Sequence, residues 1–236
     1  MIKKFFKHID NIVPLWGIPP LLMCFIINCA AYYITMWLCA DLHHYDFTLP
    51  FDMEIPVVTE WVFVYSFYCF PFWFVCYCYI ARINRDNPKE LFRFATADYL
   101  SRLICMLFFI FLPTTNVRPD IVGNSIADRL TNGLYSIDQP TNLFPSIHCL
   151  VSWFCFVGVR FHKNVKKWVK IIILISACAI MASTQFLKQH YIVDLISGVA
   201  LAELCYWFTG RIALPEKLMR WYARLVDKLF PGAKLV

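Results

Sequence analysis

The stretch LKQHYIVDLISG, residues 187–198, places a histidine and a carboxylate four positions apart. On a helix, His190 and Asp194 would share one face, because residues i and i+4 are neighbours on the helix surface. A carboxylate that accepts a proton from Nδ1 of an imidazole fixes the tautomer and leaves Nε2 free as a nucleophile or base. Taken alone, the pair is equally consistent with a structural pair that satisfies two buried polar groups.

A second histidine lies in TNLFPSIHCLVSW, residues 141–153. The sequence predicts that a helix starts here, with Pro145 in its first turn. The N–H groups of Ser146 and Ile147, together with the Ser146 hydroxyl, would then form an anion site beside His148. The alternative is an interfacial histidine next to an ordinary helix cap.

Three cations are further candidates for holding an anion. Arg118 ends the stretch PTTNVR of residues 113–118, and an arginine fork can bind a phosphate through two parallel hydrogen bonds. It is equally a cation that suits the negative end of a helix. Lys188 lies two residues before His190, and Arg129 lies in the polar segment that follows Arg118.

These polar groups are set among long uncharged stretches. Of the 236 residues, 60% are hydrophobic and only 16% are charged, whereas a soluble domain has about a quarter charged residues. The sequence predicts an all-α, polytopic membrane protein that forms a single domain over residues 1–236. Six transmembrane helices are expected, at about 13–40, 61–81, 99–117, 146–161, 171–187 and 191–209. A C-terminal helix at about 214–230 and the N-terminal MIKKFFKHI are amphipathic and are expected to lie in the membrane interface.

The basic residues predict the orientation in the membrane. With the N-terminus in the cytoplasm, 19 of the 22 Lys and Arg residues, Arg102 among them, fall in inside segments. The positive-inside rule therefore places both termini in the cytoplasm and the candidate site at the outer face. The net charge of +6 follows from this topology and does not indicate nucleic acid as a partner. We expect a multi-pass protein of the plasma membrane, which in a bacterium is the inner membrane.

Together, the two histidines, the carboxylate, the arginine and the helix start are the groups needed for phosphoryl transfer by covalent catalysis. His190 would attack phosphorus, Asp194 would stabilise the resulting cation, and His148 would protonate the departing alkoxide. Arg118 and the amides of residues 146–147 would balance the charge on the equatorial oxygens. No carboxylate cluster suited to Mg²⁺ or Zn²⁺ accompanies them, so metal-independent chemistry without a cofactor is expected.

These residues resemble the motifs of the type-2 phosphatidic acid phosphatase superfamily, which are Lys-x6-Arg-Pro, Pro-Ser-Gly-His and Ser-Arg-x5-His-x3-Asp. Here the motifs read F-x6-RP (Phe111 to Pro119), PSIH (Pro145 to His148) and ST-x5-H-x3-D (Ser183 to Asp194). The resemblance covers about residues 100–210. It implies a six-helix core with the site at the outer surface, His190 as nucleophile and His148 as acid and base.

Three positions depart from the family pattern. Phe111 stands in place of the lysine, Ile147 in place of the glycine and Thr184 in place of the arginine. Two phosphate-binding cations are therefore absent from their usual places. Lys188 is the first candidate to supply one of them, and Arg129 is the weaker candidate.

The expected function is hydrolysis of a lipid phosphate or diphosphate monoester through a phosphohistidine. Related lipid phosphotransferases, such as sphingomyelin and inositol phosphorylceramide synthases, use the same kind of site, with two histidines and an aspartate. They pass the headgroup to an alcohol. A non-catalytic lipid-phosphate binder or transporter is the third alternative. In each case the partner is a lipid phosphate, and the oligomeric state is left open.

Two other polar groups are expected to be structural. Glu203, inside the last span, is predicted to face away from Asp194 and to make structural hydrogen bonds. The outer loop 41–60, with His43, His44 and Asp46, is predicted to be a solvated interfacial loop that could still cover the site.

Overall fold

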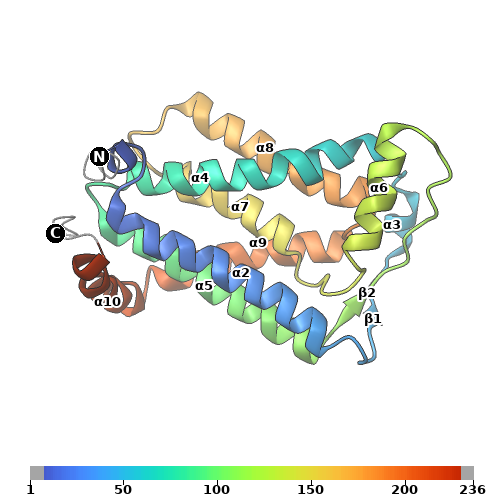
Figure 1. The fold of residues 1–236 in the computed structure, drawn as a ribbon, viewed down its shortest axis with the longest axis horizontal. Coiled ribbons are helices and arrows are strands. Elements are labelled where there is room, and N and C mark those ends of the chain that lie inside the picture. Colours follow the sequence, from blue (N-terminus) through green and yellow to red (C-terminus); the bar gives the residue numbers. More distant parts are fainter. Residues whose placement is uncertain (1–7, 230–236) are drawn as a thin grey trace.

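The computed structural model describes residues 8–229, and its long helices lie side by side in a bundle (Figure 1). The apolar helices are α2 (Ile18–Leu38), α4 (Cys69–Ile83), α5 (Pro88–Phe111), α7 (Ile147–Arg160), α8 (Lys167–Phe186) and α9 (Ile192–Thr209). Short turns lengthen two of them: Leu15–Gly17 precedes α2, while Thr59–Trp61 and a π-helical turn, Phe63–Tyr68, precede α4. The predicted all-α, polytopic architecture is confirmed.

Among residues 8–229, five helical stretches are long and apolar enough to cross a membrane. Helix α7 is the exception, with 14 residues. At about 1.5 Å per residue it is roughly 21 Å long, which is shorter than a hydrocarbon core of about 30 Å. Five of the six predicted spans therefore meet the length of a span, and a membrane crossing by α7 stays a prediction.

The third predicted span, 99–117, has the wrong limits. Helix α5 starts at Pro88, directly after its N-cap Asn87, and ends at Phe111. Arg102, which the charge count places in a cytoplasmic segment, is 1% exposed in the interior of α5 and pairs with Asp98. The first turns of α5 contain Lys89, Glu90 and Arg93, so a search for uncharged runs places the start of the helix too late.

The two ends of the bundle differ. Helix α10 (Leu214–Leu229) lies at one end, and α3 (Pro50–Glu54), α6 (Ile126–Ile137) and the strands β1 (Tyr45–Asp46) and β2 (Thr114–Thr115) lie at the other (Figure 1). The strands pair in parallel, with Tyr45 opposite Thr114. The Thr114 hydroxyl also accepts hydrogen bonds from the N–H groups of Leu143 and Phe144. Strand β2 thus fixes the loop that leads into α7.

The predicted C-terminal helix is present as α10. Its inner side contains Tyr222 and Val226, which are buried, and the Tyr222 hydroxyl lies 3.2 Å from that of Tyr99 in α5. Trp221 and Leu229 are exposed. The predicted N-terminal amphipathic segment falls mainly on residues 1–7, which lie outside the described residues.

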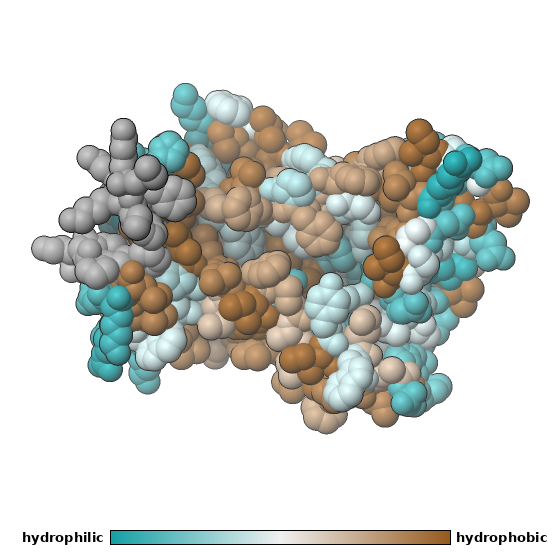
Figure 2. All heavy atoms as spheres, in the orientation of Figure 1, coloured by the Kyte–Doolittle hydropathy of each residue, from teal (hydrophilic) through white to brown (hydrophobic). Residues whose placement is uncertain are grey.

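The surface of the bundle supports a membrane location. Large apolar side chains such as Phe25, Phe74 and Ile175 are exposed along its helices. Figure 2 shows hydrophobic residues over much of the middle of the molecule and hydrophilic residues gathered towards the ends. Exposed apolar surface of this extent is typical of contact with lipid. The chain is a multi-pass integral membrane protein.

Candidate active site

Helices α7 and α9 come unusually close at their N-terminal ends. A Cβ atom added to Gly198 would lie 2.6 Å from the carbonyl oxygen of Ser146 and 3.2 Å from the backbone nitrogen of Leu150. A side chain at this position would therefore push the two helices apart. The Ser146 N–H also donates a hydrogen bond of 3.1 Å to the carbonyl oxygen of Asp194. This contact brings the histidine of each helix start to one place.

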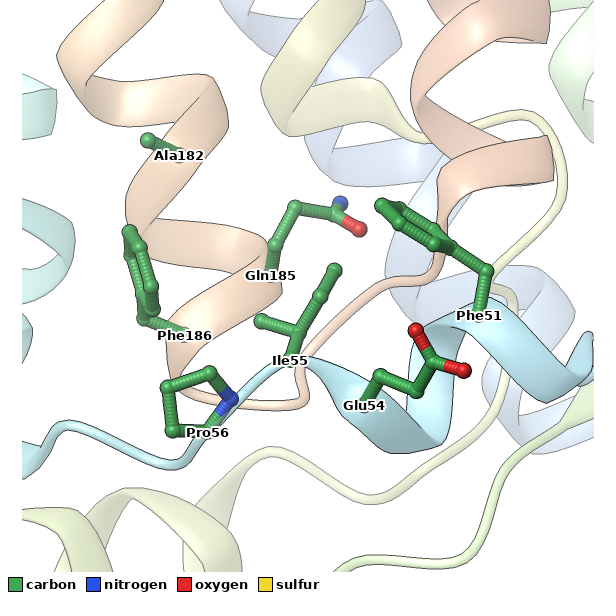
Figure 3. A pocket seen from close by; sticks show the side chains of 7 residues that line it. All are labelled: Phe51, Glu54, Ile55, Pro56, Ala182, Gln185 and Phe186. Carbon is green, nitrogen blue, oxygen red and sulfur yellow. The ribbon is translucent and has the colours of Figure 1, made fainter.

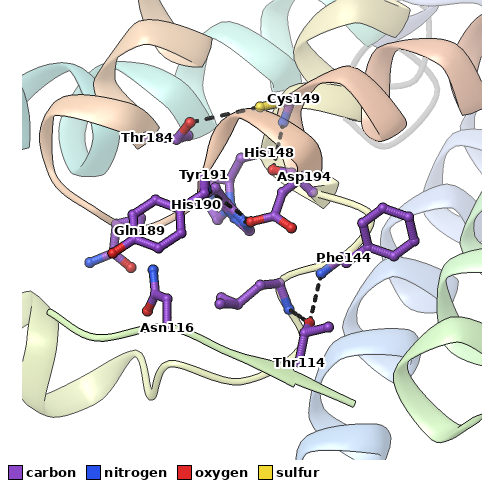
Figure 4. A network of polar contacts seen from close by, with 12 residues as sticks. Thr114, Asn116, Phe144, His148, Cys149, Thr184, Gln189, His190, Tyr191 and Asp194 are labelled. Carbon is purple, nitrogen blue, oxygen red and sulfur yellow. Dashed lines mark hydrogen bonds and ion pairs between the residues drawn. The ribbon is translucent and has the colours of Figure 1, made fainter. Parts of the chain in front are cut away.

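The two histidines face each other at this contact. Nε2 of His190 lies 3.4 Å from Nδ1 of His148, and the ring centroids are 5.6 Å apart. His148 lies in the first turn of α7, whereas His190 lies in the turn before α9, two residues ahead of Ile192, and not on one helix with Asp194 as predicted. The two side chains meet beside Asp194 (Figure 4). The nitrogen predicted to attack phosphorus is thus the one that points at the second imidazole. A phosphoryl group needs about 3 Å to each reacting atom, so we expect the rings to separate when it enters.

Asp194 supports His190 from behind. Its Oδ2 atom lies 3.7 Å from Nδ1 of His190 and accepts a hydrogen bond of 2.9 Å from the N–H of Tyr191. His190 and Asp194 are both buried, and Nδ1 of His190 has no hydrogen-bond partner within residues 8–229. Catalytic hydrogen bonds are often long before substrate binds. A small rotation of the imidazole would give Nδ1 the carboxylate as its acceptor.

His148 is held by an aromatic residue that the sequence analysis did not identify. The rings of His148 and Tyr65 stack with their centroids 4.5 Å apart, and the Tyr65 hydroxyl lies 3.4 Å from Nδ1 of His148. The same hydroxyl donates to Oδ2 of Asp138 at 3.1 Å, and the Tyr32 hydroxyl donates to the other oxygen of Asp138. Tyr65 lies in the π-helical turn, and such turns occur often at functional sites. Nothing in the local sequence pattern signals that turn.

Arg118 reaches the segment that carries His190. Its Nη2 donates to Oε1 of Gln189 at 2.7 Å, its Nη1 donates to the carbonyl oxygen of Asp138, and its guanidinium lies 5.0 Å from the ring of Tyr135. Gln189 directly precedes His190. Arg118 therefore links the end of α6 to the turn between α8 and α9.

Lys188 lies in that same turn, but its side chain extends towards α3. Its backbone is in the left-handed region, with φ of 50°, and its Nζ donates to the carbonyl oxygen of Asp52. Burial lowers the pKa of the Lys188 ammonium. Arg129, the weaker candidate, is exposed on α6, where its backbone N–H donates to Ser125.

The predicted anion site at the start of α7 differs in detail. The helix begins at Ile147, with Ser146 as its N-cap, so Pro145 lies before the helix and not in its first turn as predicted. The Ser146 hydroxyl accepts a hydrogen bond from the N–H of Cys149. The backbone N–H of Ser146 donates to the carbonyl oxygen of Asp194. The Ser146 N–H is therefore not a free donor, which leaves Ile147 as the first helical amide of this end.

The two positions that lack the family cations are unlike each other. Phe111 is 78% exposed at the end of α5. Thr184 is fully enclosed: its hydroxyl donates to the carbonyl of Met181 at 2.7 Å and accepts from Nε2 of Gln185 at 3.0 Å. One position faces outward and the other is filled by neutral hydrogen-bonding groups.

The outer loop 41–60 is more than a solvated loop. Asp52 is fully buried, and its Oδ1 accepts from the N–H of Ile192, the first residue of α9, at 2.9 Å. Its Oδ2 accepts from the N–H of Leu49 at 2.8 Å. The loop therefore caps the helix that carries Asp194. His43 is exposed, and no three His, Cys, Asp or Glu side chains of residues 8–229 are grouped so that they could hold a metal ion.

Glu203 makes structural hydrogen bonds, as expected. It accepts from Nε1 of Trp153 at 2.7 Å and from Nη2 of Arg160 at 2.6 Å. These partners hold the opposite ends of α7 and α9 together, away from the histidines.

Comparison with known proteins identifies one relationship. The model of the PAP2 superfamily matches residues 41–208, a range that includes the capping loop, both histidines and Asp194. No curated protein and no solved structure is significantly similar to the chain.

Proposed function

Because this chain belongs to the PAP2 superfamily, we propose that it is a membrane lipid phosphatase that hydrolyses a lipid phosphate or diphosphate monoester. The observation that carries the proposal is the meeting of two imidazoles, one from the start of α7 and one from the turn before α9, with Nε2 of His190 3.4 Å from Nδ1 of His148 and a carboxylate behind His190. A nucleophile and an acid–base group placed this close can act on one phosphorus atom.

In the first step, Nε2 of His190 attacks phosphorus as the P–O bond to the lipid alcohol breaks. Nδ1 of His148 gives its proton to the departing alkoxide, so the lipid leaves as a neutral alcohol. Asp194 stabilises the positive charge that develops on His190. In the second step, His148 takes a proton from water, the hydroxide attacks the phosphohistidine, and phosphate leaves. No metal ion or cofactor takes part in this scheme.

The charge on the phosphoryl oxygens is balanced by groups around the turn between α8 and α9. We assign this role to Arg118, the Ile147 N–H and the Ser146 hydroxyl, with Lys188 as a further cation if it leaves Asp52. Helix starts and arginine forks both favour phosphate oxygens. Arg129 is exposed on α6 and would meet only the outer part of a headgroup.

We place both termini in the cytoplasm and the site at the outer face. With Arg102 removed from the count, 18 of the 22 Lys and Arg residues still fall in inside segments, as the positive-inside rule requires. Helix α10 then lies at the inner interface, where its basic residues meet anionic headgroups. Residues 1–236 act as one membrane domain.

The proposal is tested by phosphate release from a panel of lipid phosphates and diphosphates, with purified protein in detergent. We expect His190→Ala and His148→Ala each to lower the rate by about a thousandfold, while His43→Ala in the outer loop leaves it unchanged. Incubation of the wild type with a lipid phosphate that carries a radiolabelled phosphoryl group should label the protein. Loss of this label in acid would identify the phosphohistidine. Full phosphate release by His190→Ala would rule the mechanism out.

A second function, headgroup transfer to an alcohol, is favoured by one observation. The two cation positions of the family are filled by neutral residues, Phe111 and Thr184, and a phosphodiester carries less negative charge than a monoester. Incubation with candidate phospholipids and an alcohol acceptor separates the two functions, because transfer yields a new lipid and hydrolysis yields free phosphate. Binding of a phosphate analogue without any trapped phosphohistidine would instead indicate a non-catalytic binder.

A further inference from the structure

A cavity of about 450 Å³ lies between α3 and the end of α8, beside the turn that carries His190. Its walls are mostly apolar, and they are formed by Phe51, Ile55, Pro56, Ala182 and Phe186. Two polar side chains, Glu54 and Gln185, complete the lining (Figure 3). A volume of this size is in the range of about 300–1,000 Å³ found for small-molecule sites.

The Gln185 amide presents an acceptor to this cavity. The Thr184 hydroxyl donates its proton to the carbonyl of Met181, so it can only accept from Gln185. The NH₂ group of Gln185 must therefore face Thr184, and Oε1 must face away from it. Gln185 is 7% exposed, and its Oε1 has no hydrogen-bond partner within residues 8–229. In Figure 3 this oxygen points towards the side of Phe51 and Glu54.

The polar groups of the cavity are of one kind. The Gln185 oxygen and the Glu54 carboxylate both accept hydrogen bonds, and none of the seven lining side chains carries a positive charge. Lys188, which reaches the same short helix through Asp52, is not part of the lining. A buried acceptor without a donor is unfavourable. A ligand that brings several N–H donors and a positive charge would satisfy both groups at once.

The cavity and the catalytic residues share one segment of chain. The carbonyl oxygen of Thr184, next to Gln185, accepts from the N–H of His190 at 3.2 Å. On the other wall, Asp52 follows Phe51 and caps α9. A group bound in the cavity would therefore lie next to Thr184 and Asp52, the two residues that hold the backbone around His190.

We propose that this cavity binds a primary ammonium group attached to an apolar stem. A primary ammonium offers three donors and one positive charge, and the rings of Phe51 and Phe186 suit its stem and its charge. As a corollary that rests on the proposed function, the substrate or acceptor of the enzyme is an amine-bearing lipid.

The test measures binding of hexylammonium chloride to the full chain in detergent micelles by titration calorimetry, with empty micelles as the blank. We expect it to bind at least fivefold more tightly than hexanol, which has the same stem without the charge, and than hexyltrimethylammonium, which has no N–H donor. Glu54→Gln and Gln185→Leu should each weaken binding by about tenfold. Glu60→Gln, an exposed carboxylate of the same loop outside the cavity, should bind as the wild type does.

Two results would overturn the proposal: equal affinity for hexylammonium and hexanol, or unchanged affinity in both cavity variants. Because Gln185 is buried, circular dichroism confirms the fold of Gln185→Leu, and Glu54→Gln provides the same test at an exposed residue. The measurement is repeated in His190→Ala. Tight ammonium binding there, without phosphohistidine formation in the wild type, would refute the phosphatase and leave the cavity site in place. Phosphate release without ammonium binding would refute the cavity site and leave the proposed phosphatase in place.

Discussion

The hydroxyl of Tyr65 lies 3.4 Å from Nδ1 of His148, and their rings stack with centroids 4.5 Å apart. The hydroxyl donates its proton to Asp138, so its oxygen is free to accept from an Nδ1–H of His148. In the proposed mechanism, Tyr65 therefore positions the imidazole that protonates the leaving alkoxide. It favours the tautomer of His148 with the proton on Nδ1, the nitrogen that faces His190.

Replacement of Tyr65 by Phe tests this role. We expect kcat for phosphate release to fall about tenfold, which corresponds to about 1.4 kcal/mol, with little change in KM, because the ring still packs and the substrate contacts remain. The alkaline side of the pH–rate profile, where the proposed acid His148 loses its proton, should change as well. Tyr68→Phe, in the same π-helical turn but bonded to Ser176, is the matched control. Unchanged kcat and pH profile in Tyr65→Phe would show that the hydroxyl has no part in proton transfer.

The close contact of α7 and α9 predicts a steric effect. Gly198→Ala places a methyl group 2.6 Å from the Ser146 carbonyl, and overpacking of this kind costs about 1–3 kcal/mol. We expect a lower midpoint of thermal unfolding. We also expect a lower rate of phosphate release at temperatures where the variant is still folded, since the displaced helix start carries His148. Gly133→Ala, at a position with no neighbouring atom within 4 Å, should leave activity intact and raise helix stability by up to about 1 kcal/mol. Equal behaviour of the two variants would contradict the packing argument.

The capping of α9 by Asp52 predicts that the outer loop supports the site. In Asp52→Asn the amide keeps one acceptor and sets a donor against a backbone N–H, so we expect a loss of about 1–3 kcal/mol in the free energy of unfolding. Hydrogen exchange should show faster opening of residues 188–194. Asp41→Asn, an exposed residue of the same loop, is the control. The prediction fails if exchange in this segment is the same in both variants.

The buried pair Asp98–Arg102 predicts a non-additive effect on stability. Oδ2 of Asp98 lies 2.9 Å from Nη2 of Arg102 and accepts from the Tyr77 hydroxyl at 2.5 Å. Arg102→Met leaves a buried carboxylate without its cation and should cost about 3–5 kcal/mol. The double variant Asp98→Leu with Arg102→Met removes both charges, and we expect it to regain most of that loss. Denaturant unfolding of the single and double variants measures the coupling, and additive losses would contradict it.

Local patterns in the sequence were sufficient for the apolar helices, the two histidines and Asp194. Hydropathy runs and the i, i+4 spacing of His190 and Asp194 depend only on residues near one another in the chain, and the PAP2 superfamily match covers the same segments. The start of α5 was missed because its first turns contain the charged residues Lys89, Glu90 and Arg93, which a search for uncharged runs leaves outside the helix.

The partners of the site residues were decided by the tertiary structure alone. Tyr65 and His148 are 83 positions apart, and Lys188 and Asp52 are 136 positions apart, so no spacing rule connects them. The sequence by itself determined which apolar helices form and which side chains can do chemistry, because those properties are local. Packing between distant segments decided that Lys188 binds a carbonyl, that the Ser146 N–H is used by Asp194, and that the two imidazoles meet.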